Sequence, residues 1–258
     1  MPIVKVNGAD VDYIQTGSGR DLVLLHSLLA DRTAFDHVVP ALAKKRRLTL
    51  VYLPGYGGSA PHGDSVEAYA DHVAALLRAL ELPHETDVLG NGLGGFIAVA
   101  LACRHGTAFD RLVIADSLAT FPPAGKEPLR LMGQRVQAQG MSAVLDAAIN
   151  RMFAPAFIAA NPRIVDERKG VLAKADPVCF SIACAALARV DLTPLLNTIA
   201  NRTFVMVGAL DGATPAPLAR ELANGIPGGK FLKIPECGHC PQIEKPETFV
   251  SEIERFLD

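Results

Sequence analysis

The sequence is poor in the features that mark several large classes of protein. Five cysteines in 258 residues are too few, and odd in number, for a disulfide framework, so we expect a reduced, cytoplasmic protein. The chain has 25 basic and 27 acidic side chains and lacks the basic excess that nucleic-acid binding requires. Its longest apolar run, residues 96–103, is far too short to span a membrane. The first residues, MPIVKVNGAD, lack the apolar core of a signal peptide.

What the chain does contain is a glycine-rich stretch at residues 86–103, TDVLGNGLGGFIAVALAC. Glycine permits positive φ and close backbone approach, so the stretch predicts a strand, a sharp turn and a helix packed tightly on that strand. Two patterns fit it. Gly90, Gly92 and Gly95 match the G-x-G-x-x-G dinucleotide fingerprint, with Asp116 about 20 residues further on. Residues 90–94 also match a G-x-S-x-G nucleophile elbow in which Gly92 replaces the serine.

The rest of the chain has the alternating pattern of an α/β protein. We expect strands at residues 3–6, 11–16, 21–26, 48–53, 87–89, 112–115, 203–207 and 230–234. Besides the helix after the glycines, we expect helices at residues 31–44, 64–80, 216–223 and 247–257. Residues 126–196 have a helical pattern throughout. Such an insertion in an α/β sheet predicts a lid over a site at the carboxyl ends of the strands.

Five stretches occur in a specific order and spacing: LLHSL at 24–28, LPGYGGS at 53–59, VLGNGLGGFI at 88–97, GALDGATP at 208–215 and GHCPQIEKPE at 238–247. Together they resemble the α/β-hydrolase family over nearly the full chain. Within that family the chain resembles the branch of enol-lactonases and carbon–carbon bond hydrolases. Two positions depart from the family pattern: Ser27 replaces the usual glycine, and Leu53 replaces an acid.

The resemblance implies an α/β-hydrolase fold, with a mostly parallel eight-stranded sheet, helices on both faces and a helical lid inserted after the sixth strand. Residues 1–120 and 197–258 would form the core domain, and residues 121–196 the lid. The order of elbow, Asp211 and His239 along the chain is the one this fold uses. A dinucleotide fold would normally place its fingerprint near the start of the domain and would have no reason to keep this acid and histidine. We therefore favour the hydrolase interpretation.

The resemblance also assigns roles to individual residues. In the family, a histidine takes a proton from the elbow serine, and an aspartate orients the imidazole and stabilises its charged form. His239 and Asp211 match these two roles. The backbone N–H groups of Leu28 and Leu93 would form the oxyanion hole. No cofactor or metal is implied. The residues expected at the substrate pocket are His26, Ser27, Asn91, Ser117, Met132 and Phe153.

Cys237 and Cys240 have the C-x-x-C spacing of thiol oxidoreductases. In those proteins the motif opens a helix early in a small domain, whereas here it precedes Pro241 near the end of a larger chain. With His239 between them, the two thiols still fall short of the four ligands of a structural zinc site. We therefore expect neither redox nor metal chemistry from this pair.

Gly92 has no hydroxyl, thiol or carboxylate, so it cannot carry an acyl group. Three hypotheses stay open. A serine was removed deliberately to trap a complex, with glycine relieving the strain of the elbow. Alternatively, the natural protein has lost its nucleophile and only binds. In the third hypothesis, His239 acts as general base on a water lodged beside Gly92, a class that includes carbon–carbon bond cleavage and decarboxylation.

We expect a cofactor-free hydrolase of small, partly apolar esters, lactones or β-diketone-like substrates. The alternative is a non-catalytic ligand-binding or interaction protein on a hydrolase scaffold. The expected partner is a small-molecule substrate, without nucleic acid or membrane, and a homodimer is left open. Lys126, Arg130 and Arg135 in the lid could meet a substrate carboxylate or could simply be solvated.

Overall fold

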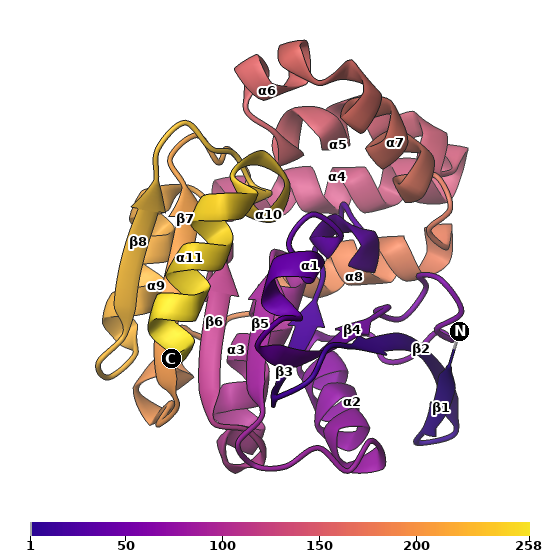
Figure 1. The fold of residues 1–258 in the computed structure, drawn as a ribbon. Helices are drawn as coiled ribbons and strands as arrows, with labels where there is room; N and C mark the ends of the chain where they lie inside the picture. The colour runs from indigo at the N-terminus through magenta and orange to yellow at the C-terminus, as the bar shows by residue number, and fades with distance from the viewer. Residues whose placement is uncertain (1) are drawn as a thin grey trace.

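The computed structural model describes residues 2–258 and has an eight-stranded sheet at its centre (Figure 1). The strands are β1 (Ile3–Val6), β2 (Ala9–Thr16), β3 (Arg20–Leu25), β4 (Arg46–Val51), β5 (Asp87–Asn91), β6 (Arg111–Ala115), β7 (Arg202–Gly208) and β8 (Lys230–Ile234). Their order is β1-β2-β4-β3-β5-β6-β7-β8. β2 runs antiparallel to both neighbours, and all strands from β4 to β8 in that order are parallel. The expectation of a mostly parallel eight-stranded sheet is confirmed.

Helices cover both faces of the sheet, which explains why the central strands consist of nearly continuous apolar runs. α2 (Val66–Ala79), α3 (Leu93–His105) and α9 (Ala216–Gly225) pack on one face, where they share a large apolar cluster with the sheet. α1 (Val39–Leu42) and α11 (Pro246–Leu257) cover the other face through a second cluster. In Figure 1, α11 lies in front of the sheet and α2 and α3 lie behind it.

The single helix expected over residues 31–44 is divided into two short pieces. A 3-10 turn, η1 (Arg32–Phe35), comes first, and α1 begins only at Val39. Pro40 stands in the first turn of α1. Proline has no N–H and its ring clashes with the carbonyl four residues earlier, which disfavours a continuous helix through this position.

Every named element between β6 and β7 is a helix. Figure 1 shows this helical insertion, α4 to α8, above the carboxyl ends of the parallel strands. Prolines at the starts of α6, α7 and α8 explain the breaks, because proline fits the first turn of a helix and not its interior. The helices are α4 (Pro123–Gln139), η3 (Met141–Val144), α5 (Leu145–Met152), α6 (Pro155–Ala160), α7 (Pro162–Leu172), α8 (Pro177–Arg189) and η4 (Thr193–Thr198). The remaining short helices are η2 (Gly106–Ala108) and α10 (Pro241–Glu244).

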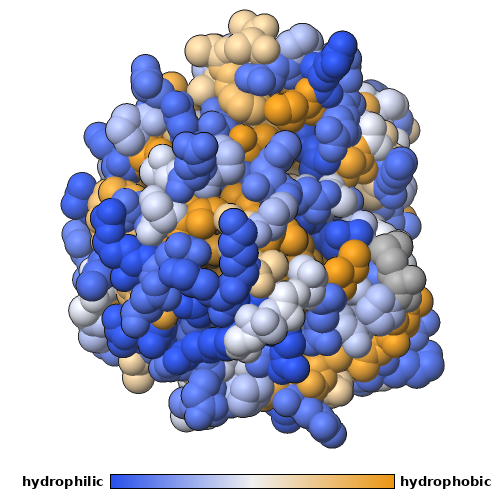
Figure 2. All heavy atoms as spheres, in the orientation of Figure 1, coloured by the Kyte–Doolittle hydropathy of each residue, from blue (hydrophilic) through white to orange (hydrophobic). Residues whose placement is uncertain are grey.

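The face formed by α11 and β8 carries mostly hydrophilic side chains, whereas apolar side chains gather over α6 at the tip of the insertion (Figure 2). Among residues 2–258, no single helix is both long enough and apolar enough to cross a membrane. Only α7 and α8 taken together reach that length and hydropathy, and they are bent by 99° relative to each other.

A buried ion cluster ties the amino ends of the strands to the end of the chain. Asp87, whose side chain is fully buried, accepts from Arg46 at 2.9 Å and from Arg20 at 3.1 Å. Arg46 also donates to the carbonyl of Leu257 at 2.9 Å, which links β4 to α11. Burial raises the pKa of Asp87, and the two guanidinium groups oppose that rise. Removing one partner of the cluster would therefore leave a buried charge without full compensation, which destabilises the fold.

We predict that Arg46→Met lowers the free energy of unfolding by about 3 kcal/mol, because it leaves Asp87 buried with half of its charge compensation. Urea unfolding at neutral pH measures this. The control is Arg255→Met, since Arg255 is 74% exposed and pairs only with Glu252 on the same helix. That change should cost less than about 0.5 kcal/mol. Equal losses in the two variants would contradict a structural role for the cluster.

Candidate active site

The turn from β5 into α3 is the elbow expected from the glycine-rich stretch. Gly92 has φ +54° and ψ −118°, a conformation that L side chains rarely adopt. The neighbouring glycines permit close packing: a Cβ on Gly90 would lie 2.1 Å from the Gly94 carbonyl oxygen. A Cβ on Gly94 would lie 2.2 Å from the carbonyl oxygen of Leu25. The elbow is thus pressed directly against the end of β3.

His239 and Asp211 meet beside the elbow in a buried pair. His239 Nδ1 lies 2.8 Å from Asp211 Oδ2, and the side chains are 5% and 0% exposed. The N–H groups of Ala213 and Thr214 donate to Asp211 Oδ1 at 2.7 and 3.0 Å, and the Thr214 hydroxyl donates to Oδ2. Burial alone would raise the pKa of Asp211, but the charge of His239 and these hydrogen bonds lower it to about 2. An ionised Asp211 holds the proton of His239 on Nδ1 and leaves Nε2 free to accept one.

Asp116 lies behind this pair and is fully buried, with Oδ1 accepting from the Gly208 N–H at 2.8 Å. Burial, and then the charge of Asp211, raise the pKa of Asp116 well above its usual value, which favours the protonated form of this acid. Asp116, Asp211 and His239 offer three ligand atoms within 4.8 Å of one another. A metal there would have to replace the hydrogen bond between His239 and Asp211.

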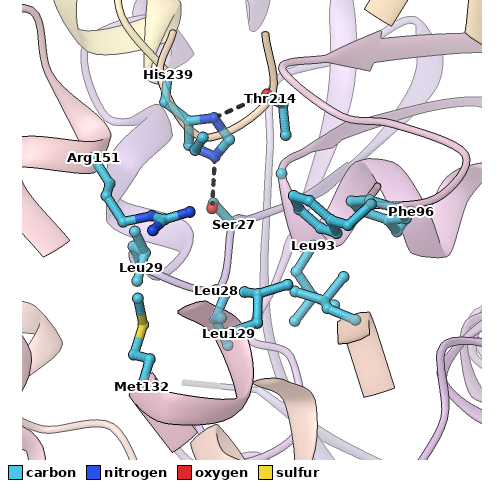
Figure 3. A pocket seen from close by; sticks show the side chains of 14 residues that line it. Ser27, Leu28, Leu29, Leu93, Phe96, Leu129, Met132, Arg151, Thr214 and His239 are labelled. Carbon is cyan, nitrogen blue, oxygen red and sulfur yellow. Dashed lines mark hydrogen bonds between the residues drawn. The ribbon is translucent and has the colours of Figure 1, made fainter. Parts of the chain in front are cut away.

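Ser27 fills the space next to Gly92. Its Oγ lies 3.3 Å from His239 Nε2, as the dashed line in Figure 3 shows. A Cβ added to Gly92 would come within 2.3 Å of the same oxygen and 2.9 Å of His239 Nε2. The hydroxyl of Ser27 therefore stands where a side chain at residue 92 would otherwise begin. His239 has a hydroxyl at its free nitrogen even though the elbow residue is glycine.

His26 anchors the loop that carries Ser27. Its ring is fully buried, and burial lowers its pKa to about 4, so the imidazole is neutral at pH 7. Nδ1 donates to the carbonyl of Ser27 at 2.9 Å, and Nε2 accepts from the Leu53 N–H at 3.0 Å. The ring thus clamps the end of β3 to the end of β4.

The two backbone N–H groups expected to form an oxyanion hole, those of Leu28 and Leu93, both lie at the cavity. The Ser27 carbonyl is fixed by His26 and by the Ala30 N–H at 3.2 Å, so the N–H of Leu28, on the opposite side of the trans peptide, points away from those partners. The Gly92 carbonyl is held inside α3, which directs the Leu93 N–H out of the helix start. Within residues 2–258 neither N–H has a hydrogen-bond partner, and both residues line the cavity.

The cavity above His239 measures about 400 Å³ with the space at its mouth included. Most of its wall is apolar and comes from both the core and the insertion (Figure 3). It is lined by Ser27, Leu28, Leu29, Gly92, Leu93, Phe96, Phe121, Leu129, Met132, Arg151, Leu187, Ala213, Thr214 and His239.

Arg151, in the last turn of α5, adds a positive charge to this apolar wall. Figure 3 shows its guanidinium on the same side of the cavity as Ser27. It has no ion-pair or hydrogen-bond partner in the part of the chain that the structure describes. Sequence reasoning missed Arg151 and singled out Lys126, Arg130 and Arg135, which do not line the cavity. The phase of a short helix in an irregular insertion gives no signal that would separate these four residues.

Two of the six residues expected at the pocket, Ser27 and Met132, line the cavity. The other four do not, which corrects the expectation. His26 faces the backbone of its own loop. Ser117 is buried under the elbow, where its Cβ would lie 2.5 Å from a Cβ on Gly95. Phe153 turns instead to Phe157, with ring centroids 5.1 Å apart.

Asn91, the fourth of these residues, positions the histidine loop. Its side-chain N–H groups donate to the carbonyl of His239 at 3.1 Å and to that of Ala115 at 3.3 Å. Its oxygen accepts from Gln242 at 3.1 Å. Asn91 therefore acts on the backbone behind His239 and is not open to a substrate.

The loop around His239 is also bound to the insertion. Glu244 accepts from the N–H of Gly238 at 2.9 Å and from that of Ala154 at 3.2 Å, and the His239 N–H donates to the Met152 carbonyl at 2.9 Å. Cys237 and Cys240 are buried free thiols, and burial raises the pKa of Cys240 well above its usual value. A thiol in that state is a poor nucleophile or metal ligand.

The chain is similar to known proteins over nearly all of its length. The model of the alpha/beta hydrolase family matches residues 22–252. A 3-oxoadipate enol-lactonase of Acinetobacter baylyi is 29% identical over 205 residues, which cover 79% of this chain and 75% of the relative. A pimeloyl-(acyl-carrier protein) methyl ester esterase of Edwardsiella ictaluri is 32% identical over 253 residues, 94% of this chain and 95% of the relative.

Solved structures show the same likeness. The enol-lactonase from Burkholderia xenovorans has a TM-score of 0.92 at 27% identity, with 99% of each chain covered. A thermophilic esterase from Thermogutta terrifontis has a TM-score of 0.91 at 27% identity, covering 99% of this chain and 97% of that one.

The link through Glu244 generates a pH prediction. Burial raises the pKa of Glu244 from its usual 4.5 to about 7, so the folded protein holds this proton more tightly than the unfolded chain does. The resulting stabilisation is complete below about pH 4.5 and is lost as the pH rises towards 7. In this window the free energy of unfolding should fall by up to about 1.4 kcal/mol per pH unit on account of Glu244.

Urea unfolding at several values between pH 4.5 and 7.5 measures the slope in the wild type and in Glu244→Gln. The variant cannot titrate at this position and should have the shallower slope, whatever its absolute stability. The charge of Glu244 also raises the pKa of Asp116, so the difference in slope reports these two coupled carboxyl groups together. Parallel slopes would show that the pKa of Glu244 is not raised in the folded protein.

Proposed function

Because the chain belongs to the alpha/beta hydrolase family, we propose that it hydrolyses small carboxylic esters or lactones that carry a negatively charged group. The observation that carries the proposal is the composition of one cavity. A proton acceptor on His239, the N–H groups of Leu28 and Leu93, and the cation of Arg151 face the same apolar space. An enol-lactonase and methyl ester esterases among the similar proteins support this substrate class.

The two N–H groups suit the chemistry of an acyl carbonyl. Ester and lactone hydrolysis passes through a tetrahedral intermediate in which the carbonyl oxygen becomes negative. Donors fixed in advance stabilise that oxygen by about 3–4 kcal/mol each. The anchored carbonyls of Ser27 and Gly92 hold the N–H groups of Leu28 and Leu93 in place before the substrate arrives.

His239 supplies the proton transfers. Its Nε2 takes the proton of the attacking hydroxyl and returns it to the leaving alkoxide. Asp211, ionised and buried, stabilises the imidazolium formed between these two steps. The surrounding apolar wall strengthens both interactions because it lowers the local dielectric constant.

Arg151 selects the substrate. A half-buried guanidinium with no protein partner among the described residues, next to leucine and methionine side chains, suits a carboxylate at the far end of a short apolar linker.

The test is a panel of p-nitrophenyl esters and five- and six-membered lactones, in which neutral acyl chains are paired with chains of equal length ending in a carboxylate. We expect turnover, with higher kcat/KM for the anionic member of each pair. Arg151→Met should lower kcat/KM by about 10- to 100-fold for anionic esters only, the value of one charged hydrogen bond. Arg135→Met, a change at an exposed arginine of the same insertion, is the control and should leave both rates unchanged.

Absence of turnover across the panel, with saturable binding of the anionic esters, would support the non-catalytic ligand-binding alternative. A loss of activity in Arg151→Met that is equal for neutral and anionic esters would exclude a role for Arg151 in charge recognition.

A second prediction concerns the proton acceptor. Asp211→Asn keeps the size of the side chain but removes the charge that orients and stabilises His239. We expect kcat to fall by about 10⁴-fold on any ester of the panel. Circular dichroism and thermal unfolding check that the fold persists. Near-normal kcat in a folded variant would show that hydrolysis does not use the pair.

A further inference from the structure

We propose that Ser27 is the nucleophile of this hydrolase and that it replaces the side chain missing at Gly92. The inference rests on the proposed ester or lactone hydrolysis and adds the atom that attacks the carbonyl. In this arrangement Ser27 from the end of β3, Asp211 from the end of β7 and His239 from the loop after β8 form a catalytic triad.

The hydrogen bonds run in the required order. The hydroxyl of Ser27 lies 3.3 Å from His239 Nε2, and Nδ1 of the same ring lies 2.8 Å from Asp211 Oδ2. A serine–histidine distance of this size is ordinary for a site without substrate. The other hydroxyl near the ring belongs to Thr214, which faces Nδ1 at 3.3 Å and already donates to Asp211. Thr214 is therefore on the wrong side of the imidazole to lose a proton to Nε2.

The space around Nε2 explains why Gly92 and Ser27 occur together. A Cβ at residue 92 would come within 2.3 Å of Ser27 Oγ and 2.9 Å of Ser27 Cβ. Glycine at the elbow is thus the condition for the observed position of Ser27. The hypothesis of a water beside Gly92 needs empty space there, and Ser27 Oγ occupies it. A simple loss or removal of an elbow serine gives no reason for a second hydroxyl to reach the same nitrogen.

The oxyanion hole keeps its two donors under this exchange. In an elbow-serine enzyme one donor is the N–H of the residue after the nucleophile, and the other comes from the neighbouring loop. With Ser27 as nucleophile, Leu28 becomes the residue that follows it and Leu93 becomes the donor from the neighbouring loop. Both N–H groups remain without a partner in the described residues.

Ser27 is also held rigidly enough for the role. It is 2% exposed, and its carbonyl is fixed by His26 and Ala30. The Tyr56 hydroxyl donates to the next carbonyl, that of Leu28, so the peptide groups on both sides of Leu28 are anchored. Few rotamers and little backbone freedom have to be lost when the substrate binds.

The reaction then has two halves. Ser27 Oγ bonds to the acyl carbon as its proton moves to His239 Nε2, the C–O bond to the alcohol breaks, and the alkoxide takes the proton from Nε2. A water next loses its proton to Nε2 and attacks the acyl carbon. The bond to Ser27 Oγ breaks, the acid leaves, and Oγ recovers the proton. With a lactone, the alkoxide formed in the first half stays attached to the acyl group.

The experiment uses a fluorophosphonate, which phosphonylates an activated serine with loss of fluoride, followed by peptide mapping by mass spectrometry. We expect one label on the wild type, at Ser27, and none on Ser27→Ala. With the ester panel, Ser27→Ala should lower kcat/KM by at least about 10⁴-fold. Ser117→Ala removes a buried hydroxyl outside the cavity and should keep both the label and the rate.

An unlabelled wild type, a label on another residue, or a folded Ser27→Ala with ester turnover near the wild-type rate would each overturn the proposal. Labelling tests whether Ser27 is the nucleophile, and the ester panel tests the proposed reaction. Either proposal can therefore fail without the other. A wild type labelled at Ser27 but inactive on the panel would support Ser27 and contradict the substrate class.

A double variant guards against loss of folding in the single one. Ser27→Gly alone should abolish labelling, and Ser27→Gly combined with Gly92→Ser should restore it, because the second change returns a hydroxyl to the same space beside Nε2. The label should then map to position 92. If the double variant unfolds at the same temperature as the wild type but is not labelled, a hydroxyl at residue 92 cannot replace the one at residue 27.

Discussion

The space beside His239 Nε2 holds one side chain, and two segments converge on it. The end of β3 arrives from one side and the turn between β5 and α3 from the other, pressed together because Gly94 has no Cβ to separate them. Whichever segment contributes the hydroxyl, the other must be glycine or withdraw its side chain. In this protein the β3 segment contributes it through Ser27, and the elbow keeps its shape with Gly92. The elbow thus keeps its positive-φ backbone at a residue that has no side chain to present.

Three buried carboxyl groups share the region behind the imidazole, and their protonation differs according to their hydrogen bonds. Asp211 accepts from two backbone N–H groups, a hydroxyl and His239, so it keeps its negative charge in spite of burial. Asp116 has one backbone donor and a charged neighbour, and its pKa is raised well above the usual value. Glu244, with its usual pKa raised by burial, titrates between these extremes. Asp211 is thus the carboxyl group that keeps its negative charge next to His239 and can stabilise the imidazolium during proton transfer.

The fold could be predicted from the sequence because apolar periodicity fixes the sheet and because five motifs occur in a specific order. The positions of Asp211 and His239 followed from those motifs. The role of Ser27 could be seen only as a departure from the usual glycine, since the distance that gives it meaning joins residues 212 positions apart. The position of Arg151 at the cavity depends on how the short helices of the insertion pack, and the local sequence does not determine that packing. Pro40 was a local sequence signal for the break between η1 and α1, but the apolar periodicity of residues 31–44 favoured a single helix.

The histidine loop and the insertion are one mechanical unit. Glu244 holds Ala154 and Gly238 together, and Met152 holds the backbone of His239. An outward swing of the α5–α6 end would pull the imidazole away from Ser27 and Asp211 at the same moment. These hydrogen bonds therefore couple the position of the imidazole to the α5–α6 end of the insertion, whereas the contribution of α4 and α8 to the cavity wall has no such link to His239.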